Sequence, residues 1–207
     1  KFIIAFNRDA GQSAQLVATL DNGQTVKKFF NVSPRRWKIE HVALNRSGRT
    51  ASAAFKKRRA PELAQINAAR RMQTDSEGWK QTFIWPVKGR ISGMFGNQRV
   101  YNGTPGSYHS GMDIAAPTGT YYVAPADGVV TLAASSPFSL EGNLLMIDHG
   151  MGLNSAFLHS SKILVKLGQK VKRGEPIGRI GSTGSATGPH LHWSMKWNKA
   201  RIDPILL

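Results

Sequence analysis

The chain contains the stretch His109-Ser110-Gly111-Met112-Asp113 and, further on, the stretch His190-Leu191-His192. His109 and Asp113 are four residues apart, so their side chains share a face in a strand or in a helix. The histidines of the second stretch are two residues apart, which places both rings on one side of a β-strand. Zinc sites that catalyse hydrolysis use three protein ligands and an open fourth position, whereas structural sites are closed by four. Imidazoles and a carboxylate at these spacings therefore indicate a catalytic metal site.

Length and composition limit the possible folds and sites. With 207 residues, 41% of them hydrophobic, the chain can form one domain or two modest ones with a real core. It has no cysteine, which excludes thiolate zinc ligands, disulfides and a nucleophilic thiol. Any metal must therefore be bound by His, Asp or Glu. No run of 18 apolar residues occurs, so no membrane-spanning helix is predicted.

The net charge is strongly positive, +16, with an isoelectric point near 10.6. Residues 1–85 hold 16 Lys and Arg against 6 Asp and Glu, and residues 86–207 hold 12 against 6. Such a surface attracts polyanions. Nucleic acid is not expected as a partner. The sequence shows neither basic residues interleaved with aromatic ones nor a helix motif of the kind that enters a DNA groove. The expected partner is an anionic envelope polymer or a membrane surface, and the alternative is a basic surface that only aids solubility.

The first 44 residues are predicted to form a small β module. Residues 14–20 and 24–30 are expected to form a hairpin, because Asn22-Gly23 between β-prone runs favours a tight turn. Residues 37–44 alternate apolar and polar side chains, which indicates a half-buried strand. His41 lies in that alternation without potential ligands nearby, so we interpret it as structural or exposed.

Residues 45–59 are predicted to form an exposed loop that ends in the basic run Lys56-Lys57-Arg58-Arg59. A helix is predicted over residues 61–72, because proline suits a first turn and the arginines at 70 and 71 suit a last one. Its modest apolar stripe favours packing over recognition. The chain is thus divided into an N-terminal β module (1–58), a linker with a helix (59–84) and a C-terminal domain (85–207).

From residue 85 the sequence changes to short β runs separated by glycine and proline. Strands are predicted at 90–96, 121–124, 128–133, 144–149, 153–159 and 190–197, and a polar loop at 97–108 leads to His109. Many short strands with such turns indicate an antiparallel sheet or a barrel-like sandwich. The predicted fold class is mainly β: a small N-terminal β module, a short linking helix and a C-terminal antiparallel β-sheet domain. The small-residue loop 181–188 is predicted to be a cleft wall or a flexible connector, and His149 to end a strand.

Further segments accompany the two opening stretches in this order: Ala124–Val130, Asn143–Leu145, His149–Gly152, Phe157–His159, Gly181–Gly184 and Gly188–His192. With them, residues 85–207 resemble the lysostaphin/LytM-type zinc metalloendopeptidases, which cut peptide links in bacterial peptidoglycan. The resemblance implies that His109, Asp113 and His192 bind one zinc ion. It also implies that His159 and His190 are a catalytic pair that does not bind the metal. Phe157 departs from the family, where tyrosine is frequent.

The resemblance implies a mechanism and a substrate. Bound zinc lowers the pKa of water from 15.7 to about 7. A histidine with a pKa of about 6.5 can take the proton and return it to the departing amine, a task we assign to His159 and His190 together. The expected function is hydrolysis of peptide crosslinks or bridges in peptidoglycan, at an extracytoplasmic location (periplasm, cell envelope or secreted). The chain begins at Lys1 rather than Met, which is compatible with the removal of a targeting segment, and no signal or anchor segment is recognised within it.

Three other functions stay open at this point. A non-catalytic LytM-type activator of cell-wall amidases would have lost zinc ligands, whereas every ligand position is filled here. A biotinyl or lipoyl carrier would need Lys196 at the exposed tip of a hairpin. A polyanion-binding envelope module would bind in a salt-sensitive way that survives a chelator.

Overall fold

A computed structural model of the chain describes residues 3–43 and 52–207, and its fold is mainly β, as predicted. The N-terminal part holds β1 (Ser13–Thr19), β2 (Thr25–Asn31), β3 (Ile39–Val42), helix α1 (Ala53–Arg71) and the 3-10 turn η1 (Gly78–Lys80). The remainder holds β4 (Arg90–Gly93), β5 (Gln98–Tyr101), β6 (Thr104–Pro105), β7 (Met112–Ala115), β8 (Tyr121–Val123), β9 (Gly128–Ala133), β10 (Asn143–Asp148), β11 (Leu153–Ser160), β12 (Lys162–Ile163), β13 (Lys170–Val171), β14 (Pro176–Arg179), β15 (His190–Trp197), β16 (Ala200–Ile202) and the 3-10 turn η2 (Pro204–Leu206). Among the described helices, none has the length and apolar character to cross a membrane.

Two sheets enclose the main core. An antiparallel sheet has the strand order β13-β9-β10-β11-β15-β7-β4, with β16 also paired to β15, and a smaller sheet has the order β12-β14-β8. Alternate side chains of the large sheet point toward the small one. The largest buried side chains between the sheets include Ile114, Tyr122, Leu145, Ile147, Phe157, Ile177 and Leu191. This sandwich holds β7 and β15, the strands that carry the candidate metal ligands, in a fixed register.

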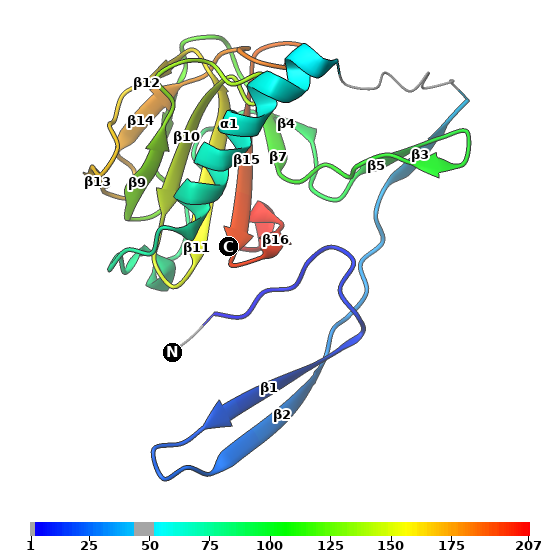
Figure 1. Cartoon of the computed structure of the whole chain (residues 1–207), viewed down its shortest axis with the longest axis vertical. Helices are drawn as coiled ribbons and strands as arrows, with labels where there is room; N and C mark the ends of the chain where they lie inside the picture. The colour runs from blue at the N-terminus through cyan, green and yellow to red at the C-terminus, as the bar shows by residue number, and fades with distance from the viewer. Residues whose placement is uncertain (1–2, 44–51) are drawn as a thin grey trace.

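Helix α1 covers part of the opposite face of the large sheet (Figure 1). Ile66 and Ala69 of α1 pack there against Leu144, Met146 and Ala156. In β15, Leu191 points into the main core, so its neighbours His190 and His192 point to the face on which α1 lies. The helix and the candidate site therefore share one face of the sheet.

The helix begins earlier than predicted. It starts at residue 53, after Ser52, whose Oγ accepts a hydrogen bond from the backbone N–H of Phe55 (3.1 Å). Ala, Lys and Arg, good helix formers, fill residues 53–60 apart from Phe55, and Pro61 lies inside the helix rather than in its first turn. The prediction of a loop was therefore wrong over residues 53–59, and its first part, residues 45–51, lies outside the described residues.

The predicted hairpin is confirmed as β1 and β2, which extend away from the sandwich (Figure 1). Gly23 has a φ of 80°, and its N–H donates to the carbonyl oxygen of Leu20 (2.9 Å). A side chain with Cβ is disfavoured at such a φ, so Asn22-Gly23 fixes the turn.

Strand β3 does not pair with this hairpin. It pairs in parallel with β5, so the prediction of a polar loop was wrong over residues 98–101. Trp37 packs against Phe95 and against Gly96, where a Cβ would lie 2.1 Å from the indole ring. The strands predicted in residues 1–44 thus form no single sheet, because β3 pairs with β5. The division of the chain into domains stays a prediction.

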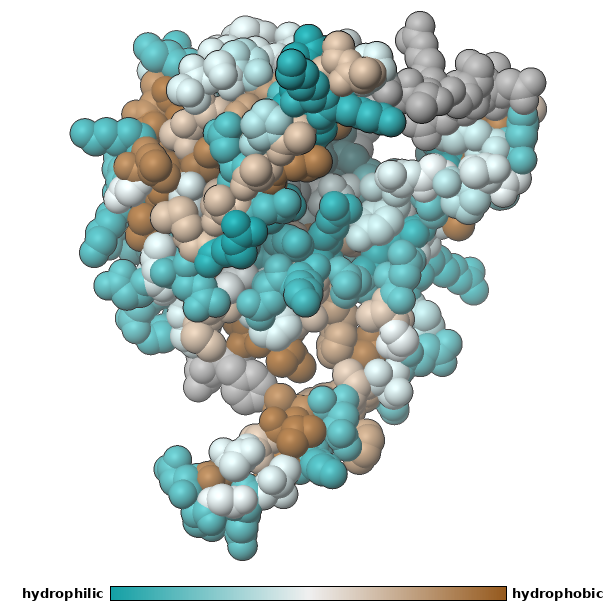
Figure 2. All heavy atoms as spheres, viewed as in Figure 1, coloured by the Kyte–Doolittle hydropathy of each residue, from teal (hydrophilic) through white to brown (hydrophobic). Residues whose placement is uncertain are grey.

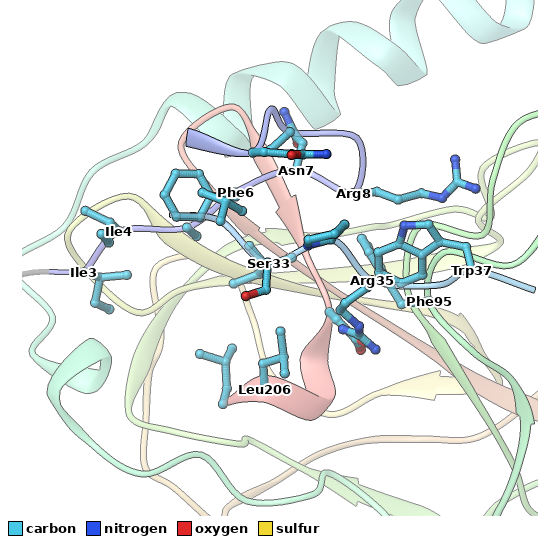
Figure 3. A pocket seen from close by; sticks show the side chains of 18 residues that line it. Ile3, Ile4, Phe6, Asn7, Arg8, Ser33, Arg35, Trp37, Phe95 and Leu206 are labelled. Atoms are coloured by element: carbon cyan, nitrogen blue, oxygen red, sulfur yellow. The ribbon is translucent and has the colours of Figure 1, made fainter. Parts of the chain in front are cut away.

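A cavity of about 340 Å³ lies where the N-terminal segment meets the C-terminus. Figure 3 shows Ile3, Ile4 and Phe6 on one side and Leu206 on another, with Trp37 and Phe95 at one end. None of the candidate ligands or catalytic histidines lines it. The cavity therefore belongs to the packing of the N-terminal segment and not to the candidate site.

His149 follows β10 and is a fully buried structural histidine, in line with the prediction that it ends a strand. Its Nδ1 donates to the carbonyl oxygen of Asp127 (2.8 Å), and its Nε2 lies 2.8 Å from Ser155 Oγ. Burial lowers the pKa of His149 from 6.5 to about 4. The folded chain therefore holds the His149 ring in its neutral form at neutral pH.

This burial predicts a loss of stability in mild acid. The unfolded chain takes up a proton at His149 near pH 6.5, whereas the folded chain resists it down to about 4. The stabilisation, about 3 kcal/mol, is complete above pH 6.5 and lost as the pH falls toward 4. Urea unfolding of metal-free protein measures this at pH 7.5 and 4.5. Between these two values the free energy of unfolding should fall less for His149→Gln than for the native chain. An equal fall for the two proteins would contradict this role of His149.

Candidate metal centre

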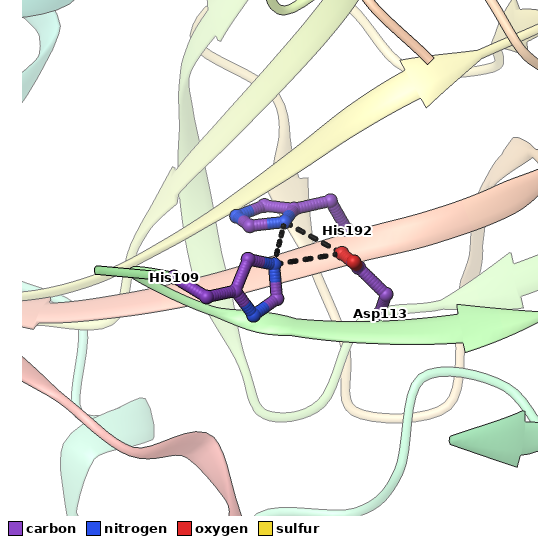
Figure 4. A group of neighbouring side chains, drawn as sticks. All are labelled: His109, Asp113 and His192. Atoms are coloured by element: carbon purple, nitrogen blue, oxygen red, sulfur yellow. Dashed lines mark hydrogen bonds and ion pairs between the residues drawn. The ribbon is translucent and has the colours of Figure 1, made fainter. Parts of the chain in front are cut away.

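Three side chains from separate parts of the chain converge on one point, as Figure 4 shows. His109 Nε2 lies 3.1 Å from Asp113 Oδ1 and 3.1 Å from His192 Nδ1, and His192 Nδ1 lies 2.7 Å from Asp113 Oδ1. Donors bound about 2.0 Å from a tetrahedral zinc ion lie about 3.3 Å apart. The three atoms are thus nearly spaced as ligands of one ion. Among the described residues, no fourth His, Asp or Glu joins the group.

Strand pairing sets two of these positions. Asp113 of β7 lies directly opposite His192 of β15 in the antiparallel register. His109 comes from the loop before β7, and this loop is fixed by two backbone bonds: Gly96 N–H to His109 O and His109 N–H to Asn97 O, both 2.8 Å. Since Gly96 also supports Trp37, the N-terminal segment packs against the loop that carries this ligand.

Contacts behind the ligands orient their donor atoms. Nδ1 of His109 is 3.0 Å from the carbonyl oxygen of Met94, which can only accept, so Nδ1 carries the proton and Nε2 offers its lone pair to the centre. Burial alone would raise the pKa of Asp113, but its bonds with His109 and His192 outweigh burial and hold that pKa well below the ordinary value. The carboxylate is therefore ionised, as a metal ligand must be.

His159 and His190 lie beside this group. Their ring centroids are 4.8 Å apart, and His190 Nε2 is 3.7 Å from Asp113 Oδ1. Nδ1 of His159 donates to the carbonyl oxygen of Thr183 (2.8 Å), and Nδ1 of His190 donates to that of Gly188 (2.8 Å). Both rings therefore keep Nε2 free to exchange a proton.

A bulge turns His159 toward the centre. By simple alternation it would point into the core with Phe157, but the pairing of β10 with β11 shifts between Asn143 and Leu145. His159 itself has a φ of 65°, unusual for a residue with a side chain. Burial lowers its pKa below 6.5, with smaller contributions from His190 and His192, so the ring is neutral at neutral pH.

Sequence reasoning missed several residues that support the site. The loop 181–188 was predicted as a cleft wall or connector, whereas its carbonyl groups at Thr183 and Gly188 orient the two histidines. Gly93 was also missed: a Cβ there would lie 2.4 Å from Asp113 Oδ2 and 3.1 Å from His109 Cε1. Backbone carbonyls carry no sequence signal, and a single glycine in a glycine-rich sequence carries little.

Two hollows border the centre. The first, the β3–β5 cleft, has a volume of about 580 Å³ and is lined by His109 and Asp113 together with residues of β3, β4 and β5. The second, the α1 cavity, has a volume of about 170 Å³ and lies between α1 and the sheet, with His192 in its wall. A chain-like ligand that crosses the centre would reach both.

Three other residues singled out from the sequence lie outside the group. Tyr108 packs on Phe95 (5.8 Å between ring centroids) and under the guanidinium of Arg8 (4.9 Å), which is a packing role. His41 is exposed in β3. Lys196 lies within the paired length of β15 rather than at a hairpin tip, which opposes a biotinyl or lipoyl carrier.

The model of peptidase family M23 matches residues 107–204. A solved structure of a Pseudomonas aeruginosa protein assigned to peptidase M23 aligns with 98% of this chain and 76% of its own, with a TM-score of 0.77 and 32% identity. The chain is 45% identical over 114 residues to the peptidoglycan DD-endopeptidase ShyA of Vibrio cholerae, or 54% of this chain and 26% of that protein. It is 41% identical over 97 residues to the DD-carboxypeptidase/endopeptidase Mpg of Neisseria meningitidis, or 47% of this chain and 22% of that protein. The chain thus spans about a quarter of the length of these curated relatives.

The close approach of Gly93 to two ligands predicts that Gly93→Ala weakens metal binding. The added methyl group must displace Asp113 or His109, and changes next to metal ligands typically cost about 10- to 100-fold in affinity. Titration of zinc against a competing chelator measures this. Gly11→Ala is the matched control, because nothing lies within 4 Å of a Cβ there and its backbone is unstrained. Equal affinities of the two variants would contradict the packing argument.

Proposed function

The chain belongs to peptidase family M23, and we propose that it is a zinc-dependent endopeptidase that hydrolyses peptide crosslinks or bridges of bacterial peptidoglycan. Its family membership confirms the resemblance read from residues 85–207. The substrate is inferred from relatives such as ShyA and Mpg, whose names specify peptidoglycan DD-endopeptidase and DD-carboxypeptidase/endopeptidase activity.

The observation that carries this proposal is the combination of three converging donors with two further histidines. His109, Asp113 and His192 would hold the zinc ion, with no fourth described donor to close its coordination. When bound, zinc would act as a Lewis acid that polarises a carbonyl group and lowers the pKa of water. Such a donor set is typical of catalytic rather than structural zinc.

His159 and His190 would move the proton. The lowered pKa of His159 leaves its Nε2 free to accept a proton at neutral pH, and the hydrogen bond to Thr183 holds the ring in place. His190, held by Gly188, lies across from it, close enough to Asp113 to be attracted once protonated. We assign proton transfer to the pair: one ring accepts from the attacking water, and a protonated ring then donates to the departing amine.

A non-catalytic activator of amidases is the alternative from another class. A binding module has no need for a complete donor set or for two imidazoles with oriented Nε2 atoms. Both are present, so we favour the enzyme.

The basic surface suggests where the chain works. Lys56, Lys57 and Arg58 are exposed in the first turns of α1, where Figure 2 shows hydrophilic side chains gathered together. Cations there oppose the helix dipole, so helix stability does not account for them. We propose that they hold the chain at an anionic polymer or membrane surface of the envelope, outside the cytoplasm.

This role predicts that the amount of protein that cosediments with sacculi falls as the salt concentration rises, because salt screens exposed charges. Binding that salt leaves unchanged would contradict this role.

The division of labour among the histidines predicts two different defects. His109→Ala should lose both zinc and activity, because it removes a ligand. His159→Ala should keep zinc but lose activity by about 100-fold or more, the usual contribution of a general acid or base. Digestion of purified sacculi, read by the masses of the released fragments, measures activity, and elemental analysis measures zinc.

His41→Ala is the matched control, because this exposed histidine should affect neither measurement. A chelator should abolish digestion by the native chain, and added zinc should restore it. Full activity of His159→Ala would refute the proton-transfer assignment, and digestion that survives complete removal of metal would refute the proposed function.

A further inference from the structure

Three cations gather beside the α1 cavity, which two of them, Arg70 and Arg201, line. Lys196 of β15 and Arg201 of β16 are direct cross-strand partners, and Arg70 comes from the last turn of α1. Like charges directly opposite each other destabilise a strand pair. In the described part of the chain, none of the three side chains forms an ion pair with a carboxylate. The fold thus maintains a concentrated positive charge at a cost.

Arg70 is the most buried of the three. Its Nε is inaccessible to solvent and has no hydrogen-bond partner in the described structure. Burial, and then Arg201, lower the pKa of Arg70 more than Glu141 raises it. Burial, Arg70 and Arg201 together lower the pKa of Lys196. Glu141 also lines the α1 cavity, but both of its oxygens are bound by Arg59 at 2.6 Å. Glu141 attracts Arg70 from a distance but is already paired with Arg59, so no described carboxylate forms an ion pair with Arg70.

The α1 cavity connects this charge to the candidate metal centre. Its wall includes Arg70 and Arg201, and also Ser110, Ser194 and the ligand His192. A group bound there lies on the same side of the large sheet as the centre, and His192 forms part of the wall that the two share. Arginine forks match carboxylates in geometry and charge.

We propose that Arg70, Lys196 and Arg201 form a subsite for a carboxylate group of the peptide substrate. This inference rests on the proposed function and specifies it: the enzyme would select crosslinked peptides that carry a free carboxylate close to the scissile bond. Helix α1, outside the residues matched by the family model, would then contribute a specificity residue to the cleft.

The test uses three synthetic crosslinked peptides. The first has all carboxylates free, the second has the side-chain carboxylate of the diamino acid amidated, and the third has the C-terminal carboxylate amidated. The native zinc-loaded chain should cut one amidated peptide with a kcat/KM about 10- to 100-fold lower than that of the free acid, and the affected peptide identifies the carboxylate. Arg70→Met and Arg201→Met should remove this preference. Arg71→Met, an exposed neighbour in α1 with the same charge change, should retain it.

Equal rates on all three peptides, or an unchanged preference in Arg70→Met and Arg201→Met, would overturn the subsite and leave the proposed function intact. Two variants guard against misfolding, since Arg201 is exposed and Arg70 is not. If the native chain cuts none of the peptides, the proposed function fails. Calorimetry with the same peptides then tests the subsite alone. Tighter binding of the free acid than of an amidated peptide, lost in Arg70→Met, supports the subsite. Equal affinities for the free and amidated peptides refute it.

Discussion

In the register that pairs β7 with β15, Asp113 lies opposite His192, and the rest of the candidate site depends on this pairing. A slip of one residue would turn both side chains to the other face of the sheet. Ile114 and Leu191, the chain neighbours of Asp113 and His192, are completely buried on the opposite face. A slip would expose them, so their burial opposes it. The hydrophobic core therefore fixes the distance between two polar groups that would otherwise be free to separate.

The two faces of the large sheet have different tasks. One face packs against the small sheet and supplies the rigid core, while the other carries the metal donors, His190 and helix α1. His159 reaches the second face only through a bulge and an unusual backbone conformation, which a well-packed sheet can maintain. The N-terminal segment packs against the loop that carries His109, because Trp37 packs on Gly96 and β3 pairs with β5.

Much of this arrangement follows from the sequence. Alternating and glycine-bounded runs predicted the strands at 128–133 and 190–197, and Asn22-Gly23 predicted the hairpin. The three converging residues and the neighbouring pair are those that the resemblance implied. The start of α1 was missed because Pro61 was interpreted as a first-turn residue, although Ser52 provides the cap. The pairing of β3 with β5 was missed because no local pattern reveals a partner some 60 residues away. The carbonyl groups that orient the histidines, at Met94, Thr183 and Gly188, belong to the backbone and leave no trace in side-chain chemistry.

The central claim is that distant segments meet to bind one zinc ion and leave one coordination position for solvent or substrate. Crystal diffraction from zinc-loaded protein, recorded on both sides of the zinc absorption edge, tests it most directly. The account predicts one anomalous peak bonded to His109 Nε2, Asp113 Oδ1 and His192 Nδ1, with His159 and His190 unbonded. A peak elsewhere, or one closed by a fourth protein ligand, would contradict it.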